Sequence, residues 1–169
     1  MASSVSREAS AAATERLTAD TAKATGPQLA TVADEILSVA VLLRTQPRLR
    51  RALTDPSRGS SDRADLLRSL LSGRVTQVTL DVLGTLAGGR FSNPSELVDA
   101  VERLGADAVL SSAEREGVLA EVEDELFRFG QIVSGNPSLA VTLSDPTAPL
   151  ESRVKLMQDL LKGKVRLAT

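Results

Sequence analysis

The stretch Leu53-Thr54-Asp55-Pro56 decides how this sequence is interpreted, because Leu143-Ser144-Asp145-Pro146 repeats it ninety positions later. Each copy lies between two apolar runs with helical spacing. The match continues without a gap from Val32 to Val75, and the first-copy positions with an identical counterpart are Val32, Asp34, Glu35, Pro47, Leu49, Leu53, Asp55, Pro56, Arg63, Leu66, Leu70, Leu71, Gly73 and Val75. Shared proline, glycine and Asp-Pro positions indicate a repeat more strongly than shared leucines do. The sequence therefore predicts a duplicated helical unit.

The similarity also extends upstream, with a change of offset. Residues 15–20 resemble residues 102–107, so the second copy holds three more residues between its blocks. The alternative interpretation is chance similarity between two amphipathic helices, which share Leu and Glu easily.

Composition limits the kind of core and the kind of partner. The chain has 169 residues, of which 42% are hydrophobic, but it has only three Phe and no Trp or Tyr. A core of Leu, Val and Ala favours helices packed closely on helices. A net charge of −2 and few aromatic rings argue against a nucleic-acid partner.

The missing residue types exclude several chemistries. There is no Cys, hence no disulfide and no thiolate metal site, and no His, hence no imidazole base or ligand. Neither a signal peptide nor an apolar run of membrane-spanning length is recognised, so no direct membrane insertion is expected.

Apolar spacing and cap residues predict an all-α bundle with an internally duplicated unit and no sheet. The segment 75–87 also alternates like a strand, but no partner strand is found, so a helix is preferred. A capping box at Ser111-Ser112-Ala113-Glu114 predicts the start of the longest helix. The predicted helices are 4–20, 27–45, 48–53, a segment capped by Ser61 or Asp62 and ended by Gly73, 75–87, one starting at Asn93-Pro94, 111–134, 137–143 and one from Pro149 to Gly163. The predicted domains are 1–90, a second duplicated unit at 91–165, and a tail at 166–169.

No stretch predicts a catalytic, cofactor or metal site. Gly88-Gly89-Arg90 is the only glycine cluster considered for phosphate and is interpreted as a helix terminator. The acidic pair Asp34-Glu35 and the acidic residues at 121–125 are interpreted as solvated helix faces. The same interpretation is preferred over an acidic or lipid partner for the basic cluster Arg44, Arg48, Arg50 and Arg51, since its counterparts in the second copy are not basic.

The order of these residues resembles a known family. Pro47, Leu53-Thr54-Asp55-Pro56, Arg63, the leucines up to Gly73, and the helix from Thr79 to Arg90 together resemble the delta subunit of F-type ATP synthase, the oligomycin-sensitivity-conferring protein family. The stretch Asp124-Glu125-Leu126-Phe127-Arg128-Phe129-Gly130 resembles the longer actinobacterial form with a helical insertion. Nothing here matches the family's C-terminal domain, so the chain is expected to be an N-terminal part.

The resemblance implies a non-catalytic stalk component at the cytoplasmic face of the plasma membrane, without a cofactor. Its partners would be N-terminal helices of the alpha subunits and, through the missing domain, the b-type subunit. The family's docking groove lies between the first and fifth helices, which here transfers to Val5, Ala9, Ala13 and Leu17 opposite Val78, Val82 and Leu86. The alternatives are a generic helical adaptor, an amphipathic membrane-surface protein and a small-molecule enzyme.

Overall fold

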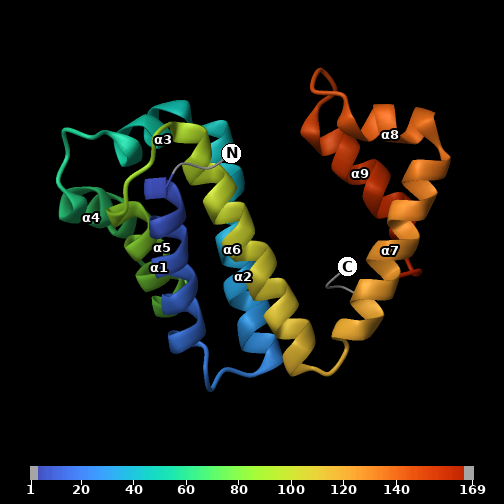
Figure 1. Cartoon of the computed structure of the whole chain (residues 1–169), viewed down its shortest axis with the longest axis horizontal. Helices are drawn as coiled ribbons and strands as arrows, with labels where there is room; N and C mark the ends of the chain where they lie inside the picture. The colour runs from blue at the N-terminus through green and yellow to red at the C-terminus, as the bar shows by residue number, and fades with distance from the viewer. Residues whose placement is uncertain (1–3, 166–169) are drawn as a thin grey trace. The chain divides into compact units, whose positions relative to one another are not determined.

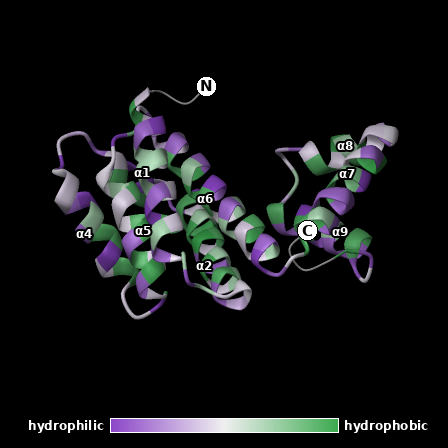
Figure 2. Ribbon diagram, turned by 60° about the horizontal axis from the view of Figure 1, so that its bottom comes forward, coloured by the Kyte–Doolittle hydropathy of each residue, from purple (hydrophilic) through white to green (hydrophobic). Residues whose placement is uncertain are grey.

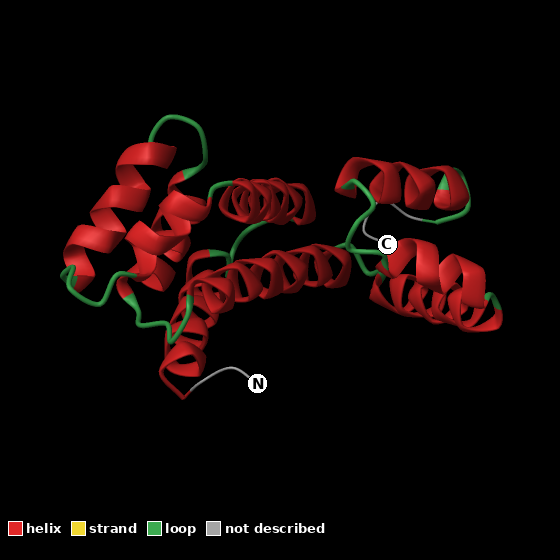
Figure 3. Ribbon diagram, turned by 90° about the horizontal axis from the view of Figure 1, so that it is seen from above, coloured by secondary structure: helices red, strands yellow, loops and turns green. Residues whose placement is uncertain are grey.

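The computed structural model describes residues 4–165, and these form nine α-helices and no strand (Figures 1 and 3). The all-α prediction is therefore confirmed, including the helix at the ambiguous segment 75–87. The helices are α1 (Ser4–Asp20), α2 (Gly26–Thr45), α3 (Pro47–Thr54), α4 (Ser60–Leu71), α5 (Gln77–Gly88), α6 (Pro94–Arg115), α7 (Leu119–Gly135), α8 (Pro137–Ser144) and α9 (Leu150–Leu161).

Local signals explain most helix ends. Thr25 and Gln28 form a capping box at the start of α2, with Pro27 in its first turn. Asn93 accepts the backbone N–H groups of Ser95 and Glu96 at 3.0 and 3.1 Å, as its predicted cap role requires. The predicted cap of α4 is wrong, because its N-cap is Gly59, which has no side chain to accept a hydrogen bond.

The predicted helix start at Ser111 is also wrong. Residues 111–115 form the last turn of α6, and the Ser112 hydroxyl is buried and donates to the Gly26 carbonyl at 2.8 Å. The break comes at Gly117, whose φ of +74° is a conformation that glycine adopts without steric cost. The tertiary packing of α6, and not the local capping-box pattern, therefore determines where this helix ends.

The contacts divide the chain into unit 1, up to Arg115, and unit 2, from Glu116 onwards. The boundary differs from the one predicted after residue 90, because α6 packs along most of α2 and belongs to unit 1. In unit 1, α5 packs against α4 and α1, while α3 packs against α6 and α4. The apolar faces of these helices meet in one core, green in Figure 2, whose largest fully buried side chains include Leu29, Ile36, Leu43, Leu53, Leu83, Leu86, Leu97 and Leu104.

Helix α2 is long and apolar enough to cross a membrane by length and composition alone, which the sequence analysis did not anticipate. In the structure eight of its residues, among them Ile36 and Leu43, are buried in unit 1, whereas Leu37, Val41 and Leu42 are exposed. Packing in unit 1 therefore accounts for part of its hydropathy.

Unit 2 repeats the local geometry of part of unit 1. Helices α3 and α8 both have 8 residues, and α4 and α9 both have 12. Asp55 and Asp145 are the C-cap residues of α3 and α8. Their φ/ψ values are nearly the same, −64°/115° and −65°/111°. Gly73 and Gly163, after α4 and α9, have φ of 72° and 70°. This agreement supports the repeat as a structural pattern, while its origin by duplication stays a prediction.

Candidate functional site

Helices α1 and α5 lie side by side in unit 1 (Figure 1). Of the seven residues predicted to form a docking groove here, Ala13, Leu17, Val82 and Leu86 are buried at 4% exposure or less, and Ala9 is 6% exposed. These five belong to the core of unit 1, in which α1 packs on α5 and α6. Only Val5, at 39% exposure, and the half-buried Val78 offer surface to a partner.

An open groove remains at the N-terminal end of α1. The lining residues on α1 are Val5, Glu8, Ala9 and Ala12, and those opposite are Thr85, Gly88, Gly89 and Arg90. Gly89 is required here, because a Cβ at this position would collide with the Cβ of Ala9 and lie 3.2 Å from its Cα. The groove thus has a small-residue floor, an acidic side chain on one wall and a basic one on the other.

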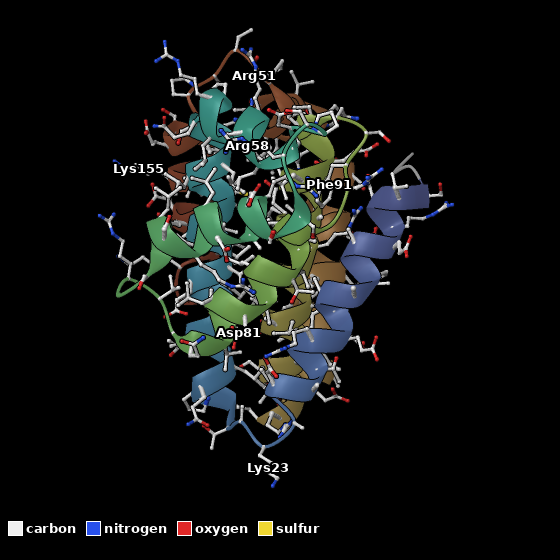
Figure 4. The ribbon with its side chains drawn as sticks, turned by 90° about the vertical axis from the view of Figure 1, so that its left-hand side faces the viewer. Lys23, Arg51, Arg58, Asp81, Phe91 and Lys155 are labelled. Carbon is white, nitrogen blue, oxygen red and sulfur yellow. The ribbon has the colours of Figure 1, made fainter. Side chains whose placement is uncertain are left out.

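A second hollow lies at the other end of the same helix pair, and Val78 is one of its lining residues. Between the two openings, the Arg16 guanidinium bonds Asp20 at 2.6 Å and Asp81 of α5 at 3.4 Å. Figure 4 shows Asp81 on α5 where α1 passes it, and Phe91 after the end of α5. The hydrogen bond and charge of Asp20 raise the pKa of Arg16, so its positive charge is retained. The structure therefore separates the predicted groove into two openings with a closed middle.

Sequence reasoning missed Glu8, Ala12, Thr85 and Gly88 to Arg90 as groove residues. It assigned the glycine pair only a terminating role, although a pair of glycines at a helix end also permits close approach of a second backbone. The groove could have been predicted from the alanine-rich outer face of α1, because small side chains leave a shallow depression.

The basic cluster serves partly to hold the fold together. Arg44 pairs with Glu102 of α6, and Arg50 donates to the carbonyls of Leu43 and Arg44 at 3.0 and 2.7 Å, at the C-terminal end of α2. Among residues 4–165, no group of three His, Cys, Asp or Glu side chains is arranged to hold a metal ion.

These features define a class of protein, an all-α module with open grooves between its helices. Residues 101–169 match the family model described as ATP synthase delta (OSCP) subunit. The delta subunit of ATP synthase from Salinispora arenicola is 52% identical over 169 residues, which is 100% of this chain and 62% of the relative. Its counterparts from Streptomyces avermitilis and Kineococcus radiotolerans are 43% and 41% identical, covering 97% and 93% of this chain and 60% and 57% of the relatives.

The resemblance to the ATP synthase delta (OSCP) subunit family that the sequence indicated is confirmed by these matches. The relatives are mostly actinobacterial, in agreement with the form that the sequence resembled. The chain spans about three fifths of the length of the curated relatives it matches, 62% for the first of them.

Proposed function

We propose that this chain is a non-catalytic part of the peripheral stalk of a proton-translocating ATP synthase, held at the cytoplasmic face of the membrane by its complex. In this role it docks N-terminal helices of alpha subunits and helps connect the catalytic headpiece to the stalk. A contact with the b-type subunit belongs to the part of the family protein that this chain does not span. The names of its relatives and the match to the family model support this assignment.

The open groove at the N-terminal end of α1 is the observation that carries the docking proposal. Its floor of Ala9, Ala12, Gly88 and Gly89 allows a partner helix to approach α1 closely, and Val5 offers an apolar contact. Glu8 and Arg90 on opposite walls favour one orientation of a partner that carries both charges. A generic helical adaptor outside ATP synthase would bind the alpha-subunit helix no better than other helices.

Calorimetric titration of the chain with a synthetic peptide of the alpha subunit's N-terminal helix tests the proposal. Two exposed alanines of α1 provide matched variants, because Ala12 lines the groove and Ala11 does not. We expect Ala12→Arg to weaken binding at least about tenfold, which is about 1.4 kcal/mol, and Ala11→Arg to leave it unchanged. Absence of binding to the folded chain, or equal loss in both variants, would overturn docking at this groove.

A further inference from the structure

Helix α2 carries large apolar side chains on the face that is turned away from the core of unit 1. Val41 is 52% exposed and Leu37 is 36% exposed, although their helix packs along α6 (Figure 1). Leu37 lies against Gly105 of α6, because a Cβ at that glycine would come within 2.5 Å of the Leu37 Cδ2 atom. The glycine thus leaves room for Leu37 to lie against α6 while part of its surface stays open. Packing within unit 1 leaves this apolar surface uncovered.

The exposed apolar residues belong to a seam with the spacing of a coiled coil. The seam residues follow one another along α2 at intervals of four, three, four and three, and they are Ala30, Asp34, Leu37, Val41 and Arg44. This alternation is the heptad pattern that lines up side chains where two helices pack against each other. Four of the five residues are exposed, and Ala30 is half-buried. The seam is therefore open to a second helix.

The two charged residues of the seam have opposite signs and lie toward its two ends. Asp34 is exposed and has no hydrogen bond or ion pair within residues 4–165. Arg44 pairs through Nη2 with Glu102 of α6, and its side chain remains 49% exposed. A guanidinium group has five N–H donors, so Arg44 can bind a second carboxylate beside Glu102. The seam thus offers one carboxylate and one guanidinium group to a partner.

The seam is complementary to itself when its direction is reversed. Leu37 and Val41 lie two positions on either side of residue 39, and the two charged residues lie five positions on either side of it. Two antiparallel α2 helices that cross at residue 39 therefore bring each Leu37 against Val41 of the partner subunit. The same register brings each Asp34 beside Arg44 of the partner subunit, and a two-fold axis makes both contacts twice. Parallel helices in register would instead place like charges together, which is unfavourable.

We propose that the seam of α2 binds a second copy of the chain, with the two α2 helices packed antiparallel about a two-fold axis at residue 39. The order of apolar and charged residues favours this occupant, because the seam itself supplies both halves of the complementary pattern. The contact covers about three helical turns, and interfaces smaller than about 1,200 Å² are usually weak. The dimer is therefore transient and depends on protein concentration. It goes beyond the stalk function proposed above and does not rest on it.

Sedimentation velocity of the full chain, from about 10 µM to about 1 mM, tests whether the dimer forms. Two exposed positions provide matched variants, because Val41 belongs to the seam and the adjacent Leu42, which is 37% exposed, does not. We expect the unmodified chain to dimerise with a dissociation constant below about 1 mM. Val41→Asp should raise this constant at least about tenfold, whereas Leu42→Asp should leave it within about twofold.

Exchanging the charges tests the antiparallel register. Asp34→Arg places two guanidinium groups together at each end of the contact, and Arg44→Asp places two carboxylates together. Each variant alone should dimerise at least about tenfold more weakly than the unmodified chain. An equimolar mixture of the two should regain the original association, because one chain then supplies both cations and the other both anions.

The mixture also separates a lost contact from a damaged fold. Arg44→Asp gives up the ion pair with Glu102, but both side chains are at least 36% exposed, and exposed pairs contribute little to stability. Circular dichroism should therefore show the same helix content in both variants. A change of fold in either chain would not be reversed by mixing.

The proposal is overturned if the chain stays monomeric at about 1 mM, if Leu42→Asp weakens the dimer as much as Val41→Asp, or if the mixture does not regain association. It is also overturned if Val41→Asp abolishes binding of the alpha-subunit peptide, because that helix would then occupy the seam. Failure of the peptide to bind at the α1/α5 groove would contradict the docking proposal and leave the dimer test unaffected.

Discussion

Helices α2–α4 and α7–α9 share their local geometry but differ in burial. Ile36 in the first stretch is fully buried, and its counterpart Leu126 is 46% exposed. Leu53 is fully buried, whereas its counterpart Leu143 is half-buried. The difference arises because α5 and α6 cover the first stretch. Among the described residues of unit 2, only Val122 is buried.

One sequence pattern thus contains information of two kinds, on where helices begin and end and on which residues are to be buried. Helix starts, stops and turns are determined within a few residues, and both stretches therefore reach the same local structure. Burial requires other segments to be present, and each large apolar side chain that is buried rather than exposed contributes about 1.5–3 kcal/mol. The first stretch should therefore be much more sensitive to mutation than the second.

The largest expected difference concerns the leucines that open the repeated motif. Leu53→Ala should lower the free energy of unfolding of unit 1 by about 4 kcal/mol, since it leaves a cavity in a packed core. Leu143→Ala should lower the stability of unit 2 by less than about 1.5 kcal/mol, because its site is partly exposed. Hydrogen exchange resolved by helix measures both. Equal losses would show that unit 2 is as well packed in solution as unit 1.

The next largest difference is expected between Arg63, which is buried, and its counterpart Arg153, which is half-buried. Arg63→Met removes the donors that bind Ala87, Gly88 and Gly89 and should destabilise unit 1 by about 3 kcal/mol. Arg153→Met loses the hydrogen bond to the Leu143 carbonyl and removes a buried Nε that has no partner among residues 4–165, so its effect should stay below about 1 kcal/mol. Chemical denaturation followed by helix-resolved exchange checks the pair. A larger effect at Arg153 would mean that it already binds a helix end.

A smaller difference is expected for the paired glutamates. Glu35→Gln keeps one acceptor but weakens the bonds to Thr76 and Thr79, so unit 1 should lose about 1 kcal/mol. Glu125→Gln should change the stability of unit 2 by less than Glu35→Gln changes that of unit 1, because Val122 is the one buried residue among those described in unit 2. The Glu15→Gln variant, on an exposed face of α1, serves as a charge-changing control. An unchanged Glu35→Gln would show that Thr76 alone caps α5.

The sequence predicted the local structure of the helices better than it predicted which helices pack against one another. Proline and glycine positions determined most helix ends correctly, and the order of residues indicated the family. The capping box at Ser111 misled, because α6 gains more by packing its last turn against the start of α2 than by ending there. A local pattern contains no information about that long-range contact.

The predicted docking residues illustrate the same division. Helical periodicity identifies the inner faces of α1 and α5, and so it selected Ala13, Leu17 and Val82, which are buried in the core of unit 1. The residues left open at the groove, such as Ala12 and Thr85, lie on the edges of those faces. Their exposure depends on the distance between the helices, which Gly89 and Ala9 set through a contact that periodicity does not report.

The smallest expected effect concerns the turns that follow α3 and α8, which are held by local hydrogen bonds. It tests whether the two stretches are equivalent at these turns. Asp55 accepts the Ser57 hydroxyl and N–H at 2.6 and 2.9 Å, and Asp145 accepts those of Thr147 at 2.7 and 2.8 Å. These bonds, the hydroxyl first, lower the pKa of both carboxyl groups. Since the folded pKa lies below the unfolded value of about 3.9, each group stabilises the fold above that pH. This contribution is lost as the pH falls through the lowered pKa.

Ser57→Ala and Thr147→Ala should therefore raise the pKa of the neighbouring aspartate toward its ordinary value, and by similar amounts. An NMR titration of the carboxyl carbons measures both groups in one sample. Because burial contributes little to either turn, the two should agree even though the surrounding helices differ. An ordinary pKa at Asp145 beside a lowered one at Asp55 would mean that the second turn forms only when unit 2 is covered, so that even this local geometry would depend on a neighbouring helix.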